Sequence, residues 1–396
     1  MEPSATAATP AQEASASPVF KPIKTHKIPN HQPPPKQPHH QHQPPLDEDD
    51  DADRSCYVCQ FAVSPALPSS SSSTASSLGS TATTQVLAAA DSSFGIGLFS
   101  RQTLEVVGRL TGHADAVSQL AFSASNASLL WSSSDDGSVR CWDLRQQAVV
   151  LGTQVKSSVH SFTLESSSEH VLAAGAGKDI MFWDLRKDLS KPLTVFEDSH
   201  TEDITRLRFH PFVPGKLFSG SIDGLVCLFD VSQSIVEEDA LLEVLPVNEA
   251  VATFGFFGAR GEDLYVLSTD QTFSAWNIDK CEELVKVKDA REALSVDYYI
   301  DCYYHAPTEK LLLFSGTNAG QVSIIEVTST GMVPLQRLSG GHTSIVRCFD
   351  WDVQVCLSFP LTLVFPSFFF CVVYPSLLLS LFVMLNNAEP QHCNRR

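Results

Sequence analysis

The chain has 396 residues and a formal net charge of −18. Proteins that bind nucleic acids neutralise phosphates with basic patches, so this charge argues against a nucleic-acid partner and favours other proteins as partners. Ten cysteines in a chain of this length are too few for a disulfide scaffold, and the first residues contain no apolar run of signal-peptide length. We therefore expect the protein in the cytoplasm, the nucleus or both.

The N-terminal segment, residues 1–54, is rich in Ala, Pro, Gln and His and ends in an acidic run at 47–53. It offers too little apolar surface to offset the entropy of ordering, so we predict that it is disordered rather than a loose metal site. Cys56 and Cys59 have the C-x-x-C spacing of a zinc site. No second pair or suitably spaced histidine follows, and we interpret them as part of a strand that ends at Val63.

From about residue 55, short runs of β-branched, aromatic and other apolar residues alternate with Gly, Asp, Ser and Asn, which is typical of strands and turns. The clearest unit opens at Gly112-His113 and has a turn at 135–137. It predicts four strands, at 117–122, 129–133, 138–143 and 148–154.

The end of the third strand, Trp142-Asp143, recurs along the chain at intervals of 41, 46, 47 and 49 residues, at Trp183-Asp184, Phe229-Asp230, Trp276-Asn277 and Ile325-Glu326. A period of this length with a terminal Trp-Asp resembles the WD-repeat family over about residues 55–352. The resemblance implies an all-β propeller. Six blades are recognisable, and the first strand of a seventh begins at Ile345.

In the second repeat, His113, Ser133, Asp136 and Trp142 match the structural tetrad of the family. The resemblance implies a chain of hydrogen bonds from indole to hydroxyl to imidazole to carboxylate. These residue types also suggest a hydrolase triad, but no Gly-x-Ser-x-Gly elbow is present and the set recurs at repeat spacing. We therefore predict no catalytic residue and a non-enzymatic protein.

Other repeats depart from this pattern. The fourth has His200, Ser219 and Asp223, but Phe229 replaces the tryptophan. The fifth has Asn277 in place of the aspartate, and the sixth has no clear Gly-His. We expect these blades to depend on apolar packing and to open more easily than the second.

Propellers bind other proteins on their faces and rim, and the fold does not say which proteins. Two repeats end in Trp-Asp-x-Arg, with Asp143 and Arg145 in one and Asp184 and Arg186 in the other. These endings resemble the motif by which some WD-repeat proteins dock onto the adaptor of a cullin-RING ubiquitin ligase. The plainer interpretation is that each arginine ends a strand on the solvated rim. The chain is then either a general scaffold or a ligase substrate receptor, with a membrane-anchored propeller as a third alternative, and we expect no cofactor and no metal.

The C-terminal tail, residues 353–396, differs from everything before it. Residues 353–385 contain no charge, and prolines at 360, 366 and 375 leave a longest proline-free stretch of ten residues, 376–385. Ten residues make about 15 Å of helix, roughly half of what a bilayer needs. The abundant Phe, Leu, Val, Ser, Pro and Cys have pyrimidine-rich codons, which favours a retained intron or mispredicted exon; a membrane segment and a divergent last blade stay open.

Overall fold

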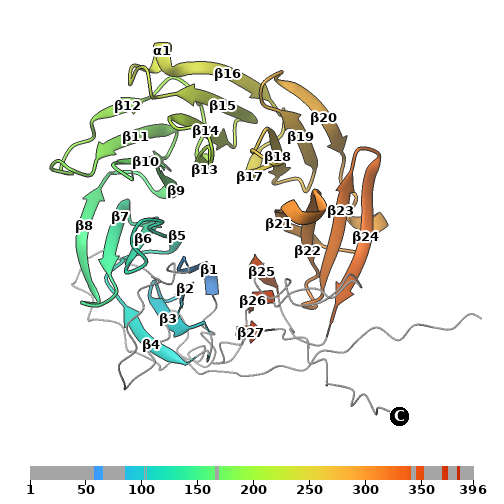
Figure 1. The fold of residues 1–396 in the computed structure, drawn as a ribbon, viewed down its shortest axis with the longest axis horizontal. Helices are drawn as coiled ribbons and strands as arrows, with labels where there is room; N and C mark the ends of the chain where they lie inside the picture. Colours follow the sequence, from blue (N-terminus) through green and yellow to red (C-terminus); the bar gives the residue numbers. More distant parts are fainter. Residues whose placement is uncertain are drawn as a thin grey trace, which may run out of the picture.

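The computed structural model of the chain describes residues 58–65, 85–101, 103, 105–165, 169–339, 345–351, 368–372 and 381–383. The predicted N-terminal segment, residues 1–54, and most of the tail lie outside these residues. Figure 1 shows the described part as a ring of small sheets around a central opening. Each sheet is antiparallel and built from consecutive strands, so the predicted all-β propeller is confirmed.

Six of the sheets have four strands, and we number them as blades 1 to 6 in chain order. Blade 1 contains β1 (Val58–Val63), β2 (Val86–Asp91), β3 (Ile96–Ser100) and β4 (Val106–Leu110). Blade 2 contains β5 (Val117–Phe122), β6 (Leu129–Ser134), β7 (Ser138–Asp143) and β8 (Ala148–Gln154). Blade 3 contains β9 (Val159–Leu164), β10 (Val171–Ala176), β11 (Asp179–Asp184) and β12 (Thr194–Phe196).

The next three blades follow the same order. Blade 4 contains β13 (Ile204–Phe209), β14 (Lys216–Ser221), β15 (Leu225–Asp230) and β16 (Leu241–Pro246). Blade 5 contains β17 (Val251–Phe257), β18 (Asp263–Ser268), β19 (Phe273–Asn277) and β20 (Glu282–Val287). Blade 6 contains β21 (Tyr298–His305), β22 (Lys310–Gly316), β23 (Val322–Thr328) and β24 (Gly331–Leu338).

The seventh sheet has three strands: β25 (Val346–Trp351), β26 (Phe368–Val372) and β27 (Leu381–Val383). Only β25 follows from the repeat pattern; β26 and β27 come from the tail. The apolar, aromatic-rich runs of the tail suit strands, and its prolines at 360, 366 and 375 fall outside both of them. β25 packs between β21 and β1, and the Val346 backbone N–H donates a hydrogen bond to Tyr298 Oη at 2.7 Å.

Strand alternation explains how the blades pack on one another. Successive side chains point to opposite faces of a sheet, so each blade presents one apolar layer to the blade before it and another to the blade after it. In blade 2, Leu130 and Trp142 lie opposite each other and pack toward blade 1. Trp131, Val139 and Cys141 point the other way and pack against blade 3.

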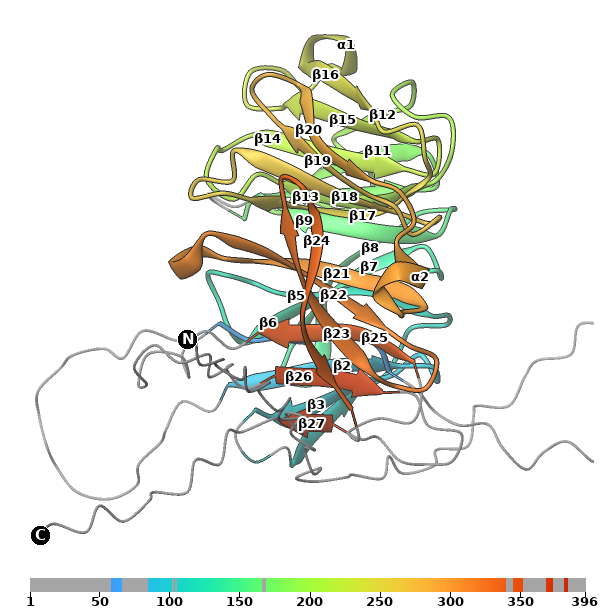
Figure 2. The same ribbon diagram turned by 90° about the vertical axis from the view of Figure 1, so that its right-hand side faces the viewer.

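The antiparallel order also fixes which loops share a face of the ring. Loops that follow the first and third strands of each blade form one face, which we call the lower face; loops after the second and fourth strands form the upper face. Figure 2 shows the ring from the side, and Figure 1 looks onto the lower face. The short helix α1 (Glu237–Ala240) and the 3-10 turn η1 (Ala306–Thr308) lie in loops of the lower face, and α2 (Arg291–Leu294) lies in one of the upper face. No helix within the described residues has the length and apolar character needed to cross a membrane.

Candidate functional site

The tryptophan of blade 2 begins a chain of buried hydrogen bonds. Trp142 Nε1–H donates to Ser132 Oγ at 2.7 Å, and Ser132 Oγ lies 2.7 Å from His113 Nε2. His113 Nδ1 lies 3.0 Å from Asp136 Oδ2 in the turn that joins β6 and β7. These hydrogen bonds connect the loop before β5 to two strands and a turn, so they fix the end of the blade that lies on the upper face.

The hydroxyl in this chain belongs to Ser132, and the predicted assignment to Ser133 is wrong. Leu130 lies opposite Trp142 in the ladder, and Ser132 is two residues further along the same face. Ser133 points to the other face, where its Oγ lies 2.7 Å from Ser118 Oγ. Strand alternation therefore decides the choice within a run of three serines.

The charges of this network support a structural role. Burial lowers the pKa of His113 below its ordinary value, in spite of the neighbouring carboxylate. Burial also opposes ionisation of Asp136, but hydrogen bonds from Ser138, the Ala114 backbone and His113 hold the pKa of Asp136 well below its usual range. A neutral imidazole then donates from Nδ1 to Asp136 and accepts from Ser132 at Nε2. Since Ser132 is 0% exposed, its hydroxyl has no access to a substrate.

Blade 4 keeps part of this arrangement. His200 Nε2 lies 2.7 Å from Ser219 Oγ, and its Nδ1 lies 3.0 Å from Asp223 Oδ2, as the sequence predicts. Phe229 lies opposite Leu217, at the place that Trp142 has in blade 2, and is fully buried. The imidazole, hydroxyl and carboxylate are therefore bonded without an indole donor.

Blades 3 and 5 keep the tryptophan but lose its serine. In blade 5, Trp276 Nε1–H donates instead to Ser274 Oγ on its own strand at 3.0 Å. In blade 3, Ala174 stands where blade 2 has Ser132, and Trp183 Nε1 has no hydrogen-bond partner among the described residues. The residues of blade 3 thus leave a buried donor unsatisfied.

The two Trp-Asp-x-Arg endings form matched turns on the lower face. Asp143 Oδ1 accepts the backbone N–H of Arg145 at 2.8 Å, and Asp184 Oδ1 accepts that of Arg186 at 3.1 Å. Asp230 makes the same bond to the Ser232 N–H at 3.0 Å, in a blade that has no arginine there. Each aspartate therefore shapes the turn that follows its strand.

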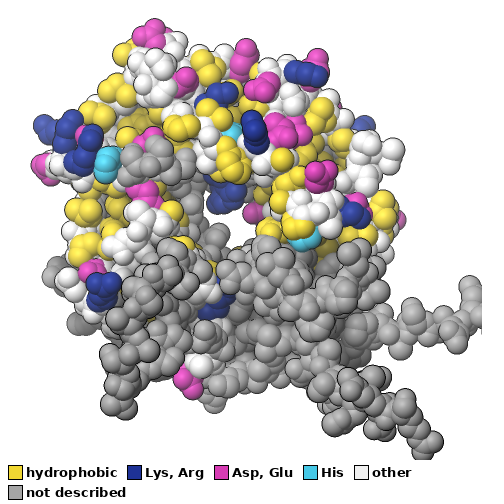
Figure 3. Space-filling view, viewed as in Figure 1, with side chains coloured by type: hydrophobic (Ala, Val, Ile, Leu, Met, Phe, Trp, Pro, Cys, Tyr) yellow, Lys and Arg dark blue, Asp and Glu magenta, His cyan; other side chains and the backbone are white. Residues whose placement is uncertain are grey.

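The two arginines differ in what their side chains contact. Arg186 is bound by its own Asp184, with Nε 2.8 Å from Oδ1 and a terminal nitrogen 2.9 Å from Oδ2, while its side chain stays 64% exposed. This pair holds the pKa of Asp184 well below its usual range. The Arg145 side chain is exposed and forms no ion pair or hydrogen bond within the described part of the chain. Figure 3 shows basic side chains at the rim beside these turns.

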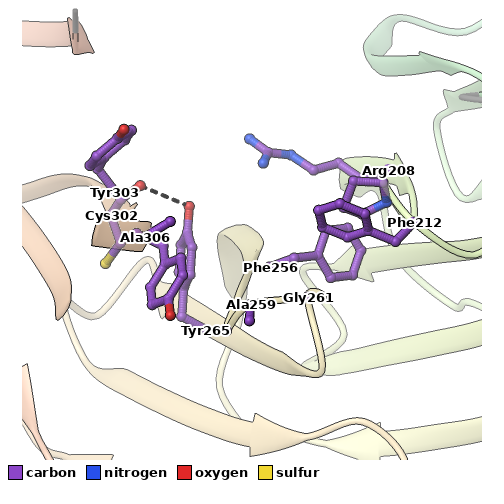
Figure 4. A pocket seen from close by; sticks show the side chains of 12 residues that line it. Arg208, Phe212, Phe256, Ala259, Gly261, Tyr265, Cys302, Tyr303 and Ala306 are labelled. Carbon is purple, nitrogen blue, oxygen red and sulfur yellow. Dashed lines mark hydrogen bonds between the residues drawn. The ribbon is translucent and has the colours of Figure 1, made fainter. Parts of the chain in front are cut away.

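The structure also assembles a pocket that the sequence did not reveal. It has a volume of about 340 Å³ and lies on the lower face, where the hairpins joining the first two strands of blades 4, 5 and 6 meet. In Figure 4, Arg208 and Phe212 lie on one side, Tyr303 on the other and Tyr265 between them. Its residues come from three separate repeats, so no local motif could predict it.

A buried histidine positions one wall of this pocket. His210 Nδ1 accepts the backbone N–H groups of Phe212 and Val213, at 3.1 and 2.9 Å. Its Nε2 then carries the proton and donates to the Gly261 carbonyl oxygen at 3.0 Å. Burial lowers the pKa of His210, which keeps this bridge between blades 4 and 5 neutral.

Comparison with known proteins agrees with this architecture. The sequence model named "WD domain, G-beta repeat" matches residues 104–143 and 190–230. The chain is 30% identical over 310 residues to the WD repeat-containing protein 89 homolog of Dictyostelium discoideum, covering 76% of this chain and 78% of that protein. The chain belongs to the WD-repeat family. It is also 35% identical over 269 residues to WD repeat-containing protein GTS1 of Arabidopsis thaliana, covering 64% of this chain and 68% of that protein.

The two matched segments of this WD-repeat protein contain the first three strands of blades 2 and 4, each preceded by the last strand of the blade before it. These are the blades that hold a bonded His-Ser-Asp set. Blades 3, 5 and 6 form from the same strand pattern without it. Family likeness in the sequence therefore follows the polar network more closely than it follows the fold.

Proposed function

We propose that this WD-repeat protein is a non-catalytic scaffold of the cytoplasm or nucleus that binds other proteins through the lower face of its ring. The observation that supports this most concerns two cationic side chains and one aromatic side chain on that face. Arg145 and Arg208 are cations without a partner among the described residues, and Phe212 is 63% exposed. The two imidazole–hydroxyl–carboxylate sets that the sequence offered are hydrogen-bonded inside blades 2 and 4, where Ser132 and Ser219 are 0% exposed.

A test of the scaffold compares partners captured by the wild type and by a variant with a changed lower face. Arg145→Glu combined with Phe212→Glu should remove specific partners from an affinity purification read by mass spectrometry. Val107→Glu is the control, because Val107 is 51% exposed on the outer strand β4 and away from that face. Identical partner sets for all three proteins would refute binding through the lower face.

The second candidate is a substrate receptor of a cullin-RING ubiquitin ligase. Arg145 and Arg186 leave equivalent turns of neighbouring blades on one face, as a two-point docking site requires. Because Arg186 is already paired with Asp184, we expect Arg145 to contribute more to docking. A guanidinium that is unpaired before binding can offer both ends of its fork to a carboxylate of the adaptor.

Purified adaptor should therefore be retained by the wild type, lost with the double variant Arg145→Ala and Arg186→Ala, and retained by Arg260→Ala. Arg260 is an exposed arginine on the lower face of blade 5. Exposed substitutions of this kind change the free energy of unfolding by less than about 0.5 kcal/mol, so the variants should melt alike. Equal retention by wild type and double variant would leave the general scaffold as the function.

A further inference from the structure

The pocket on the lower face contains positive charge that the described residues do not neutralise. The Arg208 guanidinium points into the space between the pocket walls in Figure 4. It forms no ion pair or hydrogen bond with any described residue. Arg206 lies two residues away on the same face of β13, and its Nε is buried without a hydrogen-bond partner. Figure 3 shows basic side chains at the central opening beside this strand.

Asp301 is the carboxylate whose charge acts on Arg206, and one of its oxygens already accepts two hydrogen bonds. Asp301 Oδ1 accepts hydrogen bonds from Tyr265 Oη and from the Cys302 backbone N–H, both at 2.8 Å. Burial and the neighbouring Arg208 lower the pKa of Arg206 to about 10, so Arg206 stays charged at neutral pH. Two cations therefore share the surroundings of one carboxylate, which leaves an excess of positive charge here in a chain whose net charge is −18.

The shape and lining of the pocket narrow the class of anion. A volume of about 340 Å³ lies at the small end of ligand sites and holds one or two side chains rather than a large cofactor. A single accessible guanidinium matches the planar, bidentate geometry of a carboxylate. The other walls are aromatic or apolar, and Phe212 at the mouth is exposed to solvent. These surfaces suit an apolar side chain next to the acid.

We propose that this pocket binds a short acidic segment of a partner protein. A glutamate or aspartate carboxylate pairs with Arg208, and an adjacent apolar side chain packs against Phe212. This assignment rests on the proposed scaffold function and names one of its binding sites. The occupant is a separate protein, and its acidic side chain supplies a negative charge opposite Arg208, the arginine that lines the pocket.

The test uses the full chain and three fluorescein-labelled nonapeptides, Gly-Ser-Gly-Leu-X-Leu-Gly-Ser-Gly, in which X is glutamate, glutamine or phosphoserine. Fluorescence anisotropy should show binding of the glutamate peptide and on the order of tenfold weaker binding of the glutamine peptide. Arg208→Gln should weaken binding of the glutamate peptide by a similar factor, and Phe212→Ala should weaken all three peptides. Arg260→Gln removes the same charge on the adjoining hairpin without lining the pocket, and should bind like the wild type.

Several outcomes would overturn the proposal. Equal binding of the glutamate and glutamine peptides would remove the role of the carboxylate, and selective binding of the phosphoserine peptide would assign the pocket to phosphate. Binding that requires Asp49→Asn, Asp50→Asn and Asp51→Asn would show that the chain's own acidic segment is the occupant. The double variant Arg145→Ala and Arg186→Ala should bind the peptide normally, so failure of the adaptor test leaves this proposal standing. Capture of partners through the lower face without any peptide binding would refute the pocket and keep the scaffold.

Discussion

Blades 2 and 3 each have a tryptophan at the same position of the third strand, yet the two indole N–H groups differ in their hydrogen bonding. Trp142 and Trp183 are 2% and 1% exposed, and each is the fifth residue of the third strand of its blade. Trp142 Nε1–H donates to Ser132 Oγ at 2.7 Å. In blade 3, Ala174 takes the place of that serine, and Trp183 Nε1 has no hydrogen-bond partner among the described residues. A buried donor left unsatisfied costs about 1–3 kcal/mol.

The difference separates two contributions to the fold. Strand alternation and a large aromatic ring are common to both blades, and they are enough to build the sheet and pack it against its neighbours. Of these two blades, only blade 2 has the row of hydrogen bonds from indole to carboxylate, which adds stability to a fold that blade 3 reaches without it. Blade 4 is intermediate in its polar contacts, because His200 is hydrogen-bonded to Ser219 and Asp223 but Phe229 has no N–H group to donate.

The largest expected effect concerns the packing that all the blades share. Trp183→Ala in blade 3 and Phe229→Ala in blade 4 should each reduce the free energy of unfolding by about 3–5 kcal/mol, because each leaves a cavity in a fully buried layer. Urea unfolding measures both. A reduction of less than about 1 kcal/mol for either variant would show that packing of the aromatic ring is not a main source of stability in that blade.

The next effect separates ring packing from the hydrogen bond. Trp142→Phe should destabilise by about 1–3 kcal/mol, because it removes a donor from a buried network as well as part of a ring. Trp183→Phe loses similar ring volume but also removes an unsatisfied N–H, so it should cost about 1 kcal/mol less than Trp142→Phe. Equal losses in the two blades, measured by denaturant unfolding, would mean that the Ser132 hydrogen bond contributes nothing.

A third substitution should give the tryptophan of blade 3 the hydrogen-bond acceptor that it lacks among the described residues. Ala174→Ser places a hydroxyl where blade 2 has Ser132, and it should stabilise the protein by about 0.5–1.5 kcal/mol by accepting the Trp183 N–H. Ala173→Ser is the matched control, because Ala173 is equally buried but points to the opposite apolar layer, and its hydroxyl should destabilise. Similar changes in the free energy of unfolding from the two substitutions would contradict the orientation of β10, which places side chains 173 and 174 on opposite faces of the sheet.

The sequence predicted most of the strands of the propeller, but fewer of the contacts between its side chains. Three strands of blade 2, β5, β7 and β8, begin and end where the pattern of apolar residues placed them. The serine was misassigned because 132–134 are all serines, although alternation from Leu130 would have selected Ser132. The strands β26 and β27 were not predicted, since the tail has no repeat pattern. The pocket around Arg208 depends on how three blades meet, which no single repeat encodes.

The smallest expected effect is a difference in pH dependence between blades that contain the buried histidine and blade 3, which lacks it. Burial lowers the pKa of His113 and of His200 from the ordinary value of 6.5. Each is neutral in the folded protein, while the unfolded chain takes up protons as the pH falls through 6.5. Stability is therefore retained above that pH and lost below it, by at most about 0.7 kcal/mol per histidine between pH 7 and pH 6. The pKa of Asp136 is also lowered in the fold, so its contribution is likewise lost on acidification, but only once the pH falls into and below the usual carboxylate range. Urea unfolding at pH 7, 6 and 5, with imidazole NMR signals followed in the folded protein, measures the histidine window, and unfolding at pH 4 and 3 measures that of Asp136. If stability rises on acidification from pH 7 to pH 6, the folded histidines bind protons and pair with Asp136 and Asp223 as cations, and the neutral network described for blades 2 and 4 is wrong.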